Sequence, residues 1–128
     1  MKAQLRLRVS EKDVHYAGGL APGAYVIGLF GDVATELAIR SDGDEGLLVG
    51  YENIEVLQPV YAGDFLEIEG EIVQRGNTSR KMQFEAKKYI TNTGSPFASS
   101  ADVLEEKLVV ARAVGTTVVT KNKQRSSS

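Results

Sequence analysis

Two acidic residues, Asp32 and Glu36, lie one helical turn apart in the stretch of the chain that is richest in apolar and small residues. This stretch, residues 19–39, reads GLAPGAYVIGLFGDVATELAI and predicts a long helix without a polar face. We expect such a helix to be surrounded by other elements, where a carboxylate is costly unless it is paired or used. The two acids therefore indicate proton transfer by a helical carboxylate.

The two acids differ in the alternatives that the sequence leaves open. Glu36 precedes Arg40 by four residues, a favourable spacing for a structural ion pair. Asp32 has no such partner, so its structural alternative is a buried carboxylate held by a loop or a partner subunit. We therefore place Asp32 first and Glu36 second as candidate catalytic residues.

The elements that must position these acids follow from the hydrophobic pattern. Pro22 is expected as the first helical residue of a helix from 22 to about 40. Alternating or apolar runs predict strands over 3–9, 47–60, 64–74, 80–90 and 107–119, with a hairpin turn at 75–79 and a polar loop over 91–106. This order predicts an α+β fold in which a five-stranded antiparallel sheet curls around one long helix. We expect a single domain over 1–121 and a polar C-terminal tail over 122–128.

Composition excludes several classes of function. The 128 residues carry a net charge of −2, no cysteine and one histidine. The nearly balanced charge does not indicate nucleic-acid binding. The N-terminus reads as neither a signal peptide nor a membrane span. The absence of cysteine fits a reducing cytoplasm. With one histidine and no EF-hand pattern, we expect no metal.

Four segments carry a resemblance to a known family. PVYAGD (59–64) followed by an alternating strand is similar to the strand–turn signature of the hotdog fold. The segments that match a narrower family are GLFGDVATEL (28–37), DGDEGL (42–47), QPVYAGDFLEIEGEI (58–72) and ARAVGTTVV (111–119), and FGDVATEL together with DGDEGL is the most specific of them. On these segments the chain resembles the 3-aminobutyryl-CoA and β-alanyl-CoA ammonia-lyases of the hotdog superfamily.

The resemblance implies a carbon–nitrogen lyase of lysine fermentation. Such an enzyme removes ammonia from a β-aminoacyl-CoA, for example 3-aminobutyryl-CoA, and leaves an enoyl-CoA such as crotonyl-CoA. No cofactor is implied, because coenzyme A is part of the substrate. Hotdog enzymes bind the thioester at the start of the long helix, where unpaired N–H groups near Gly23 and Ala24 would stabilise the oxyanion.

The resemblance also implies roles for polar residues elsewhere. The acids Asp42, Asp44 and Glu45 oppose the dipole at the end of the helix, so they either hold the substrate's ammonium group or simply end the helix in a solvated turn. In the turn at 75–81, the candidates for binding coenzyme A are Asn77, Ser79 and Arg80, although a hairpin turn would be polar in any case.

Arg112 stands alone in an apolar strand. It either pairs with Asp32 or Glu36, or reaches a phosphate of coenzyme A.

A single five-stranded sheet leaves exposed edges, which small hotdog chains cover by pairing two sheets. We expect at least a homodimer, or a higher symmetric oligomer, with active sites between subunits. Two other functions remain open on the same scaffold: an acyl-CoA thioesterase and a non-catalytic acyl-CoA-binding protein.

Overall fold

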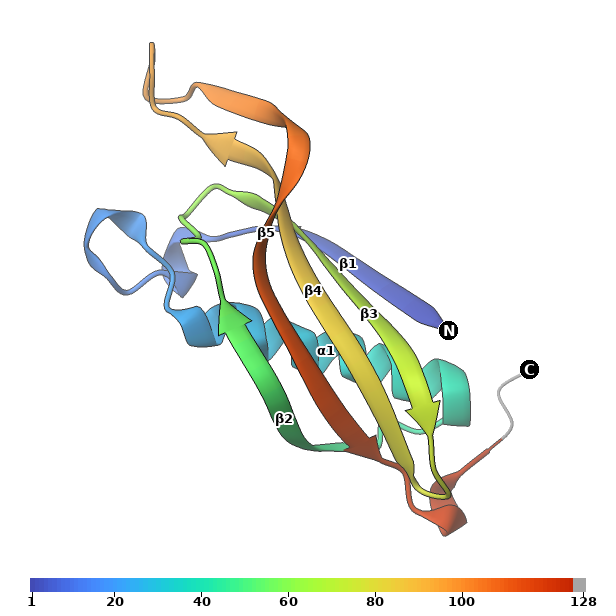
Figure 1. The fold of residues 1–128 in the computed structure, drawn as a ribbon. Helices are drawn as coiled ribbons and strands as arrows, with labels where there is room; N and C mark the ends of the chain where they lie inside the picture. The colour runs from blue at the N-terminus through green and yellow to red at the C-terminus, as the bar shows by residue number, and fades with distance from the viewer. Residues whose placement is uncertain (126–128) are drawn as a thin grey trace.

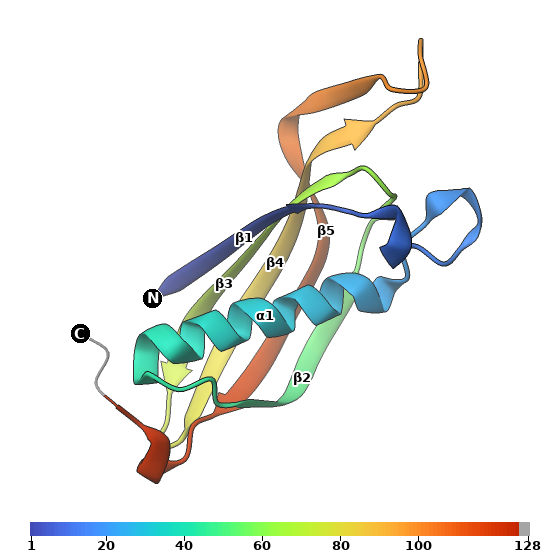
Figure 2. The ribbon, with the colours of Figure 1, turned by 180° about the vertical axis from the view of Figure 1, so that it is seen from behind.

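One long helix lies across one face of an antiparallel five-stranded sheet (Figures 1 and 2). The structure is a computed structural model that describes residues 1–125. Its main elements are β1 (Lys2–Arg8), α1 (Gly23–Asp42), β2 (Leu47–Val56), β3 (Phe65–Arg75), β4 (Ser79–Asn92) and β5 (Ala101–Val118). Single turns of 3₁₀ helix lie at Glu11–Asp13, Ala17–Gly19 and Lys121–Lys123. The strands are ordered β1-β3-β4-β5-β2 and every pair is antiparallel, which confirms the α+β arrangement predicted from the sequence.

Strand β3 illustrates how alternation in the sequence builds the two faces of the sheet. Leu66 and Ile68 are fully buried under α1, whereas Glu67, which lies between them, and Glu69, which follows Ile68, alternate with them and face the opposite, outer side of the sheet. Gly70 lies where the helix approaches most closely: a Cβ atom there would lie 2.6 Å from a methyl group of Val33. Glycine at this position lets the helix pack directly against the strand.

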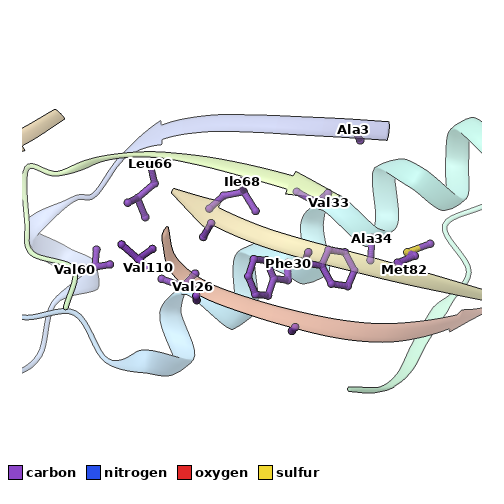
Figure 3. Packing of buried hydrophobic residues seen from close by; sticks show 14 of the residues in the cluster. Ala3, Val26, Phe30, Val33, Ala34, Val60, Leu66, Ile68, Met82 and Val110 are labelled. Carbon is purple, nitrogen blue, oxygen red and sulfur yellow. The ribbon is translucent and has the colours of Figure 1, made fainter. Parts of the chain in front are cut away.

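The inner face of α1 supplies the centre of the core. Val26, Phe30, Val33 and Leu37 recur at helical spacing and are buried against the sheet. Figure 3 labels the first three of them. Phe30 stacks on Phe84 of β4 with ring centroids 5.3 Å apart. Burial of each such side chain contributes about 1.5–3 kcal/mol, so this face is what holds the helix on the sheet.

The outer face of α1 is uncovered in the single chain. A Cβ atom added at Gly28 or Gly31 would meet nothing within 4 Å, and Asp32 is exposed. The prediction that the helix is surrounded on all sides, with Asp32 shielded from solvent, is therefore wrong for the isolated chain. The physical reason is that five strands form one layer, which covers only one side of a helix.

The ends of α1 also differ from the prediction. Pro22 is the N-cap with extended backbone (ψ 148°), and the first helical residue is Gly23. At the other end the helix continues through Ser41 and Asp42 to Gly43, whose φ of 68° is the left-handed conformation that glycine adopts at little cost. The first glycine of the acidic segment ends the helix, as expected, but two residues later than predicted.

Strands β4 and β5 extend into a hairpin arm that projects beyond the body of the sheet (Figure 1). Residues 90–92 pair with residues 101–103, so the connecting loop covers only 93–100. The prediction of a loop over 91–106 is wrong because backbone hydrogen bonds pair polar segments as readily as apolar ones.

The predicted tail is partly attached to the domain. Gln124 donates to the carbonyl groups of Asn77 and Val119, and Arg125 donates to the carbonyl of Gly43. Gln124 and Arg125 therefore contact the body of the fold, and residues 126–128 lie outside the described residues. Within residues 1–125, no helix is long and apolar enough to cross a bilayer.

Candidate active site

An apolar hollow with a volume of about 350 Å³ lies where α1 begins. Residues of the segment 16–26, residues 56–60 and one side chain of β5 meet there. The lining residues are Tyr16, Leu20, Ala21, Pro22, Gly23, Val26, Val56, Leu57, Gln58, Pro59, Val60 and Val110. Figure 3 shows Val26 of the helix close to Val60 and Val110 at this end of the core. The hollow can accept an apolar group and offers few polar side chains of its own.

The start of α1 presents unpaired donors beside this hollow. The described residues provide no side chain that caps the helix, and the carbonyl of Pro22 accepts from the N–H of Tyr25 (3.0 Å). The N–H groups of Gly23 and Ala24 precede the first intrahelical bonds and lie at the positive end of the helix dipole. Gly23 lines the hollow, whereas Ala24 does not. Of the two predicted oxyanion donors, the structure places only Gly23 at the hollow.

The predicted catalytic acids lie farther along the helix. At 1.5 Å per residue, Asp32 lies about 14 Å from Gly23 along the axis, and Glu36 lies about 20 Å from it. Asp32 is exposed on the outer face. Within one chain, therefore, neither acid reaches a group bound at Gly23.

Glu36 forms the ion pair that the spacing allowed. Its Oε2 accepts a hydrogen bond from Nε of Arg40 at 2.8 Å, and both side chains are substantially exposed. The two residues line a second, broader hollow beside residues 2–4 of β1. The ion pair with Arg40 thus confirms the structural interpretation of Glu36, whereas no hydrogen bond or ion pair within residues 1–125 accounts for Asp32.

The acidic segment after the helix is tied down by contacts within the chain. Both carboxylate oxygens of Asp42 accept from the Arg80 guanidinium at 2.9 Å, and both side chains are buried. These hydrogen bonds lower the pKa of Asp42 against the opposing effect of burial, and Asp42 raises the pKa of Arg80. Asp44 accepts the N–H of Gly46, and Glu45 is exposed. The predicted roles of Asp42 at an ammonium group and of Arg80 at coenzyme A would both require this pair to separate.

The predicted coenzyme A residues lie away from the hollow. Asn77 lies in the turn between β3 and β4, and Ser79 is the first residue of β4. Arg80 and Asp42 fasten this turn to the C-terminal end of α1. That end is about 28 Å from Gly23 along the helix.

Arg112 lies on the outer face of the sheet and pairs with Glu85 across the strands at 3.0 Å. Its predicted pairing with Asp32 or Glu36 is wrong, because the helix covers the opposite face.

One buried charged pair near the hollow was not predicted. Nζ of Lys88 lies 2.9 Å from Oδ2 of Asp64, and both side chains are buried. The signal was present in the alternation of β4: Lys88 falls at an inward-facing position in line with Met82, Phe84 and Ala86. No group of three metal-binding side chains occurs within residues 1–125.

Comparison with known proteins places this arrangement in a family. No protein-family model matches the chain. The 3-aminobutyryl-CoA ammonia lyase of Acetoanaerobium sticklandii is 55% identical over 125 residues, covering 98% of this chain and 99% of the relative. Among solved structures, the β-alanyl-CoA:ammonia lyase of Clostridium propionicum is 38% identical with a TM-score of 0.94, covering 98% of this chain and 90% of that one.

More distant structures share the fold alone. A hexameric broad-specificity acyl-coenzyme A thioesterase matches with a TM-score of 0.75 at 23% identity, covering 95% of this chain and 81% of that one. The five-stranded sheet with one long helix is thus the hotdog fold, as the sequence resemblance implied. The chain belongs to the 3-aminobutyryl-CoA ammonia lyase family and is a carbon–nitrogen lyase.

Proposed function

We propose that this protein eliminates ammonia from 3-aminobutyryl-CoA to give crotonyl-CoA, as a step of lysine fermentation. The relationship to the 3-aminobutyryl-CoA ammonia lyase supports this substrate over the shorter β-alanyl thioester, because the identity is 55% in the first case and 38% in the second. The observation that carries the proposal is the apolar hollow that ends at the uncapped start of α1. An acyl thioester needs both features: an apolar space for its chain and N–H donors for its carbonyl oxygen.

The reaction defines what the site must do. A base removes a proton from the carbon next to the thioester carbonyl, and the electron pair of that C–H bond forms the carbon–carbon double bond. The amino group leaves from its protonated, ammonium form: the bond to nitrogen breaks, its electron pair stays on nitrogen, and neutral ammonia departs. Negative charge collects on the thioester oxygen during this process. The N–H of Gly23, with that of Ala24 behind it, would hold this oxygen, so the chemistry needs no metal or organic cofactor. Coenzyme A enters only as part of the substrate.

The proton-transferring group in this proposal is Asp32, with Glu36 as the second choice because Arg40 already occupies it. The axial separation of about 14 Å between Asp32 and Gly23 means that the acid must come from a second copy of the chain. Strand β2 supports such an assembly, because it is an edge strand with exposed apolar side chains at Leu47, Val49, Ile54 and Val56. We therefore propose at least a homodimer with active sites between its subunits.

The residues predicted to bind the ammonium group and coenzyme A fit the same site shared between two chains. Asp44 and Glu45, for the ammonium group, and Asn77 and Ser79, for coenzyme A, all lie near the C-terminal end of α1. They would therefore act on a substrate bound to a second copy. Arg112 would reach a phosphate only by leaving Glu85. For Asp42 and Arg80 we propose a structural role in place of ligand binding.

One assay tests the reaction. The protein is incubated with crotonyl-CoA and ammonium, and separately with crotonyl-CoA alone, while enoyl absorbance and free thiol are measured. Loss of enoyl absorbance only with ammonium is the expected result. Thiol release in both mixtures would identify a thioesterase instead, and no change in either would identify a binding protein.

A mixed assembly tests whether the site is shared. Gly23→Pro chains and Asp32→Asn chains, each inactive alone, are unfolded together and refolded as a 1:1 mixture. In a symmetric dimer with shared sites, about a quarter of wild-type activity should return, because half of the dimers are mixed and each has one intact site. No recovery, with mixed dimers demonstrated, would mean that both residues act from the same chain.

A further inference from the structure

The buried pair of Lys88 and Asp64 lies beside the hollow but belongs to none of the roles assigned above. Asp64 is fully buried and Lys88 is only 6% exposed. The Lys88 ammonium contacts the Asp64 carboxylate at 2.9 Å, donates to the carbonyl of Pro59 at 3.0 Å and lies 5.6 Å from the ring centre of Tyr61. Removing two charges from water costs several kcal/mol unless their geometry and remaining hydrogen bonds are good.

The pair holds both ends of one turn. Oδ2 of Asp64 accepts the N–H of Tyr61 at 2.8 Å, and Oδ1 accepts the hydroxyl of Thr91 at 3.0 Å. Because Lys88 binds the carbonyl of Pro59, the pair joins the first residue of the Pro59–Asp64 turn to the last. The described residues contain no buried side-chain polar atom without a partner, so this network is complete.

The same turn is hydrogen-bonded to the chain that leads into α1. The N–H of Ala21 donates to the carbonyl of Val60 at 2.8 Å, and the N–H of Ala62 donates to the carbonyl of Gly19 at 2.9 Å. Pro59 and Val60 form one wall of the hollow, and Pro22 and Gly23 form another. The turn is therefore the connection between the apolar wall and the helix start that carries the N–H donors.

We propose that Lys88 is a positioning residue. Through Asp64 and the Pro59–Asp64 turn, it fixes the distance between the acyl wall of the hollow and the N–H of Gly23. This inference rests on the proposed function, because it assumes that the thioester binds in that hollow. Misplacement of a thioester by about 1 Å from its donor costs up to a hundredfold in rate.

The test compares the double variant Lys88→Met/Asp64→Asn with wild type. Lys88→Met alone leaves a buried, unpaired carboxylate, so it can fail to fold for reasons unrelated to positioning. The double variant removes both charges, and its amide can still accept from Tyr61 and donate to Thr91. The matched control is Lys81→Met, which removes another β4 lysine whose partner, Glu52, lies at 3.2 Å on the exposed face.

Four quantities are measured: the melting temperature, kcat for 3-aminobutyryl-CoA, KM for the same substrate, and the carbonyl ¹³C chemical shift of bound [1-¹³C]crotonyl-CoA. For the double variant we expect a melting temperature close to that of wild type, a kcat at least tenfold lower and a KM changed by less than threefold. The carbonyl resonance should move downfield on binding to wild type and to the control, and less so on binding to the double variant.

A folded double variant with wild-type kcat and the full carbonyl shift would overturn the inference. The chemical shift also separates this inference from the proposed function. Suppose that the wild-type protein releases no ammonia but shifts the carbonyl resonance, and that the double variant loses this shift. The first result would refute the lyase reaction, and the second would support the positioning role.

Discussion

The two ends of α1 are built in opposite ways. At the C-terminal end, Gly43 donates to Ile39, Arg125 covers the carbonyl of Gly43, and the buried pair of Asp42 and Arg80 joins the helix to β4. At the N-terminal end no side chain of the described residues caps the helix, and its first residue lines an apolar hollow.

Both ends of a helix leave backbone groups that need partners. Where the chain itself supplies partners, as for the carbonyls of Ile39, Asp42 and Gly43, those groups contribute stability and are not available to a ligand. Where the chain supplies none, the groups are free for a ligand with the complementary charge. The comparison predicts that substitutions at the C-terminal end affect stability, whereas substitutions at the N-terminal end affect turnover.

The largest effect is expected at the C-terminal end. Arg80→Met leaves the Asp42 carboxylate buried without a partner, which should lower the free energy of unfolding by about 3–5 kcal/mol. Urea denaturation measures this loss, and kcat of the folded fraction should stay within twofold of wild type. Asp42→Leu/Arg80→Met, which removes both charges, should recover most of the stability. A large loss of kcat in this folded double variant would show that the pair also serves catalysis.

At the N-terminal end, Gly23→Pro removes one N–H from a position where proline suits the helix backbone. If this N–H holds the oxyanion, kcat should fall by about 10²–10³ with little change in the melting temperature. Gly23→Ala is the control, since it keeps the N–H and its added Cβ would lie 3.5 Å from Val56, an ordinary contact. Equal activity of the two variants would remove Gly23 from the mechanism.

Between the two ends, Asp32→Asn tests whether the exposed middle of the helix takes part in turnover. We expect the fold to be retained and turnover to fall by roughly a hundredfold or more, as is usual for loss of a general acid or base. Steady-state kinetics with 3-aminobutyryl-CoA provides the measurement, and Glu36→Gln provides the comparison at the residue paired with Arg40. Survival of activity in the first variant and its loss in the second would reverse the assignment.

The smallest effect is expected at Glu67, a buried carboxylate on the outer face of the sheet. Its ion pairs lie away from both ends of α1, so its substitution tests whether charge pairs there affect stability without affecting turnover. Burial alone would raise its pKa, but hydrogen bonds from Lys107 and Arg6 outweigh this and lower the pKa to about 2. Because the folded pKa lies below the unfolded value of 4.5, its contribution is complete above pH 4.5 and is lost as the pH falls towards about 2. We expect the contribution of Glu67 to the free energy of unfolding to be about 3 kcal/mol. It is measured by urea denaturation across this pH range, as the difference in stability between wild type and Glu67→Gln. A difference that does not change with pH would argue against the ion pairs as its source.

Much of the fold could be predicted from local pattern. The alternation in β3 and β4 placed Leu66, Ile68, Met82 and Phe84 inside, and all four are buried. The arm formed by β4 and β5 could not be predicted, because its pairing depends on backbone hydrogen bonds between polar segments. The spacing of Glu36 and Arg40 predicted their pair correctly, since that contact lies within one helix.

Less of the candidate active site could be predicted from the sequence. The hollow combines residues 16–26, 56–60 and 110, and only folding brings these segments together. Arg80 and Lys88 both fall on the inward-facing side of β4, so the alternation predicts that each needs a buried partner. It does not identify those partners as Asp42 and Asp64, which come from distant parts of the chain. Nor could it show that Asp32 is exposed, because exposure depends on what covers the other side of the helix.

The order of residues determined which positions of each strand and helix face inward, where α1 begins and ends to within two residues, and to which family the chain belongs. These properties depend on neighbours along the chain, whose spacing is fixed by helix and strand geometry. Tertiary structure alone decided which charges became partners and which end of α1 stayed open. A charge selects its partner by distance and by its removal from water, and both arise only when distant segments meet.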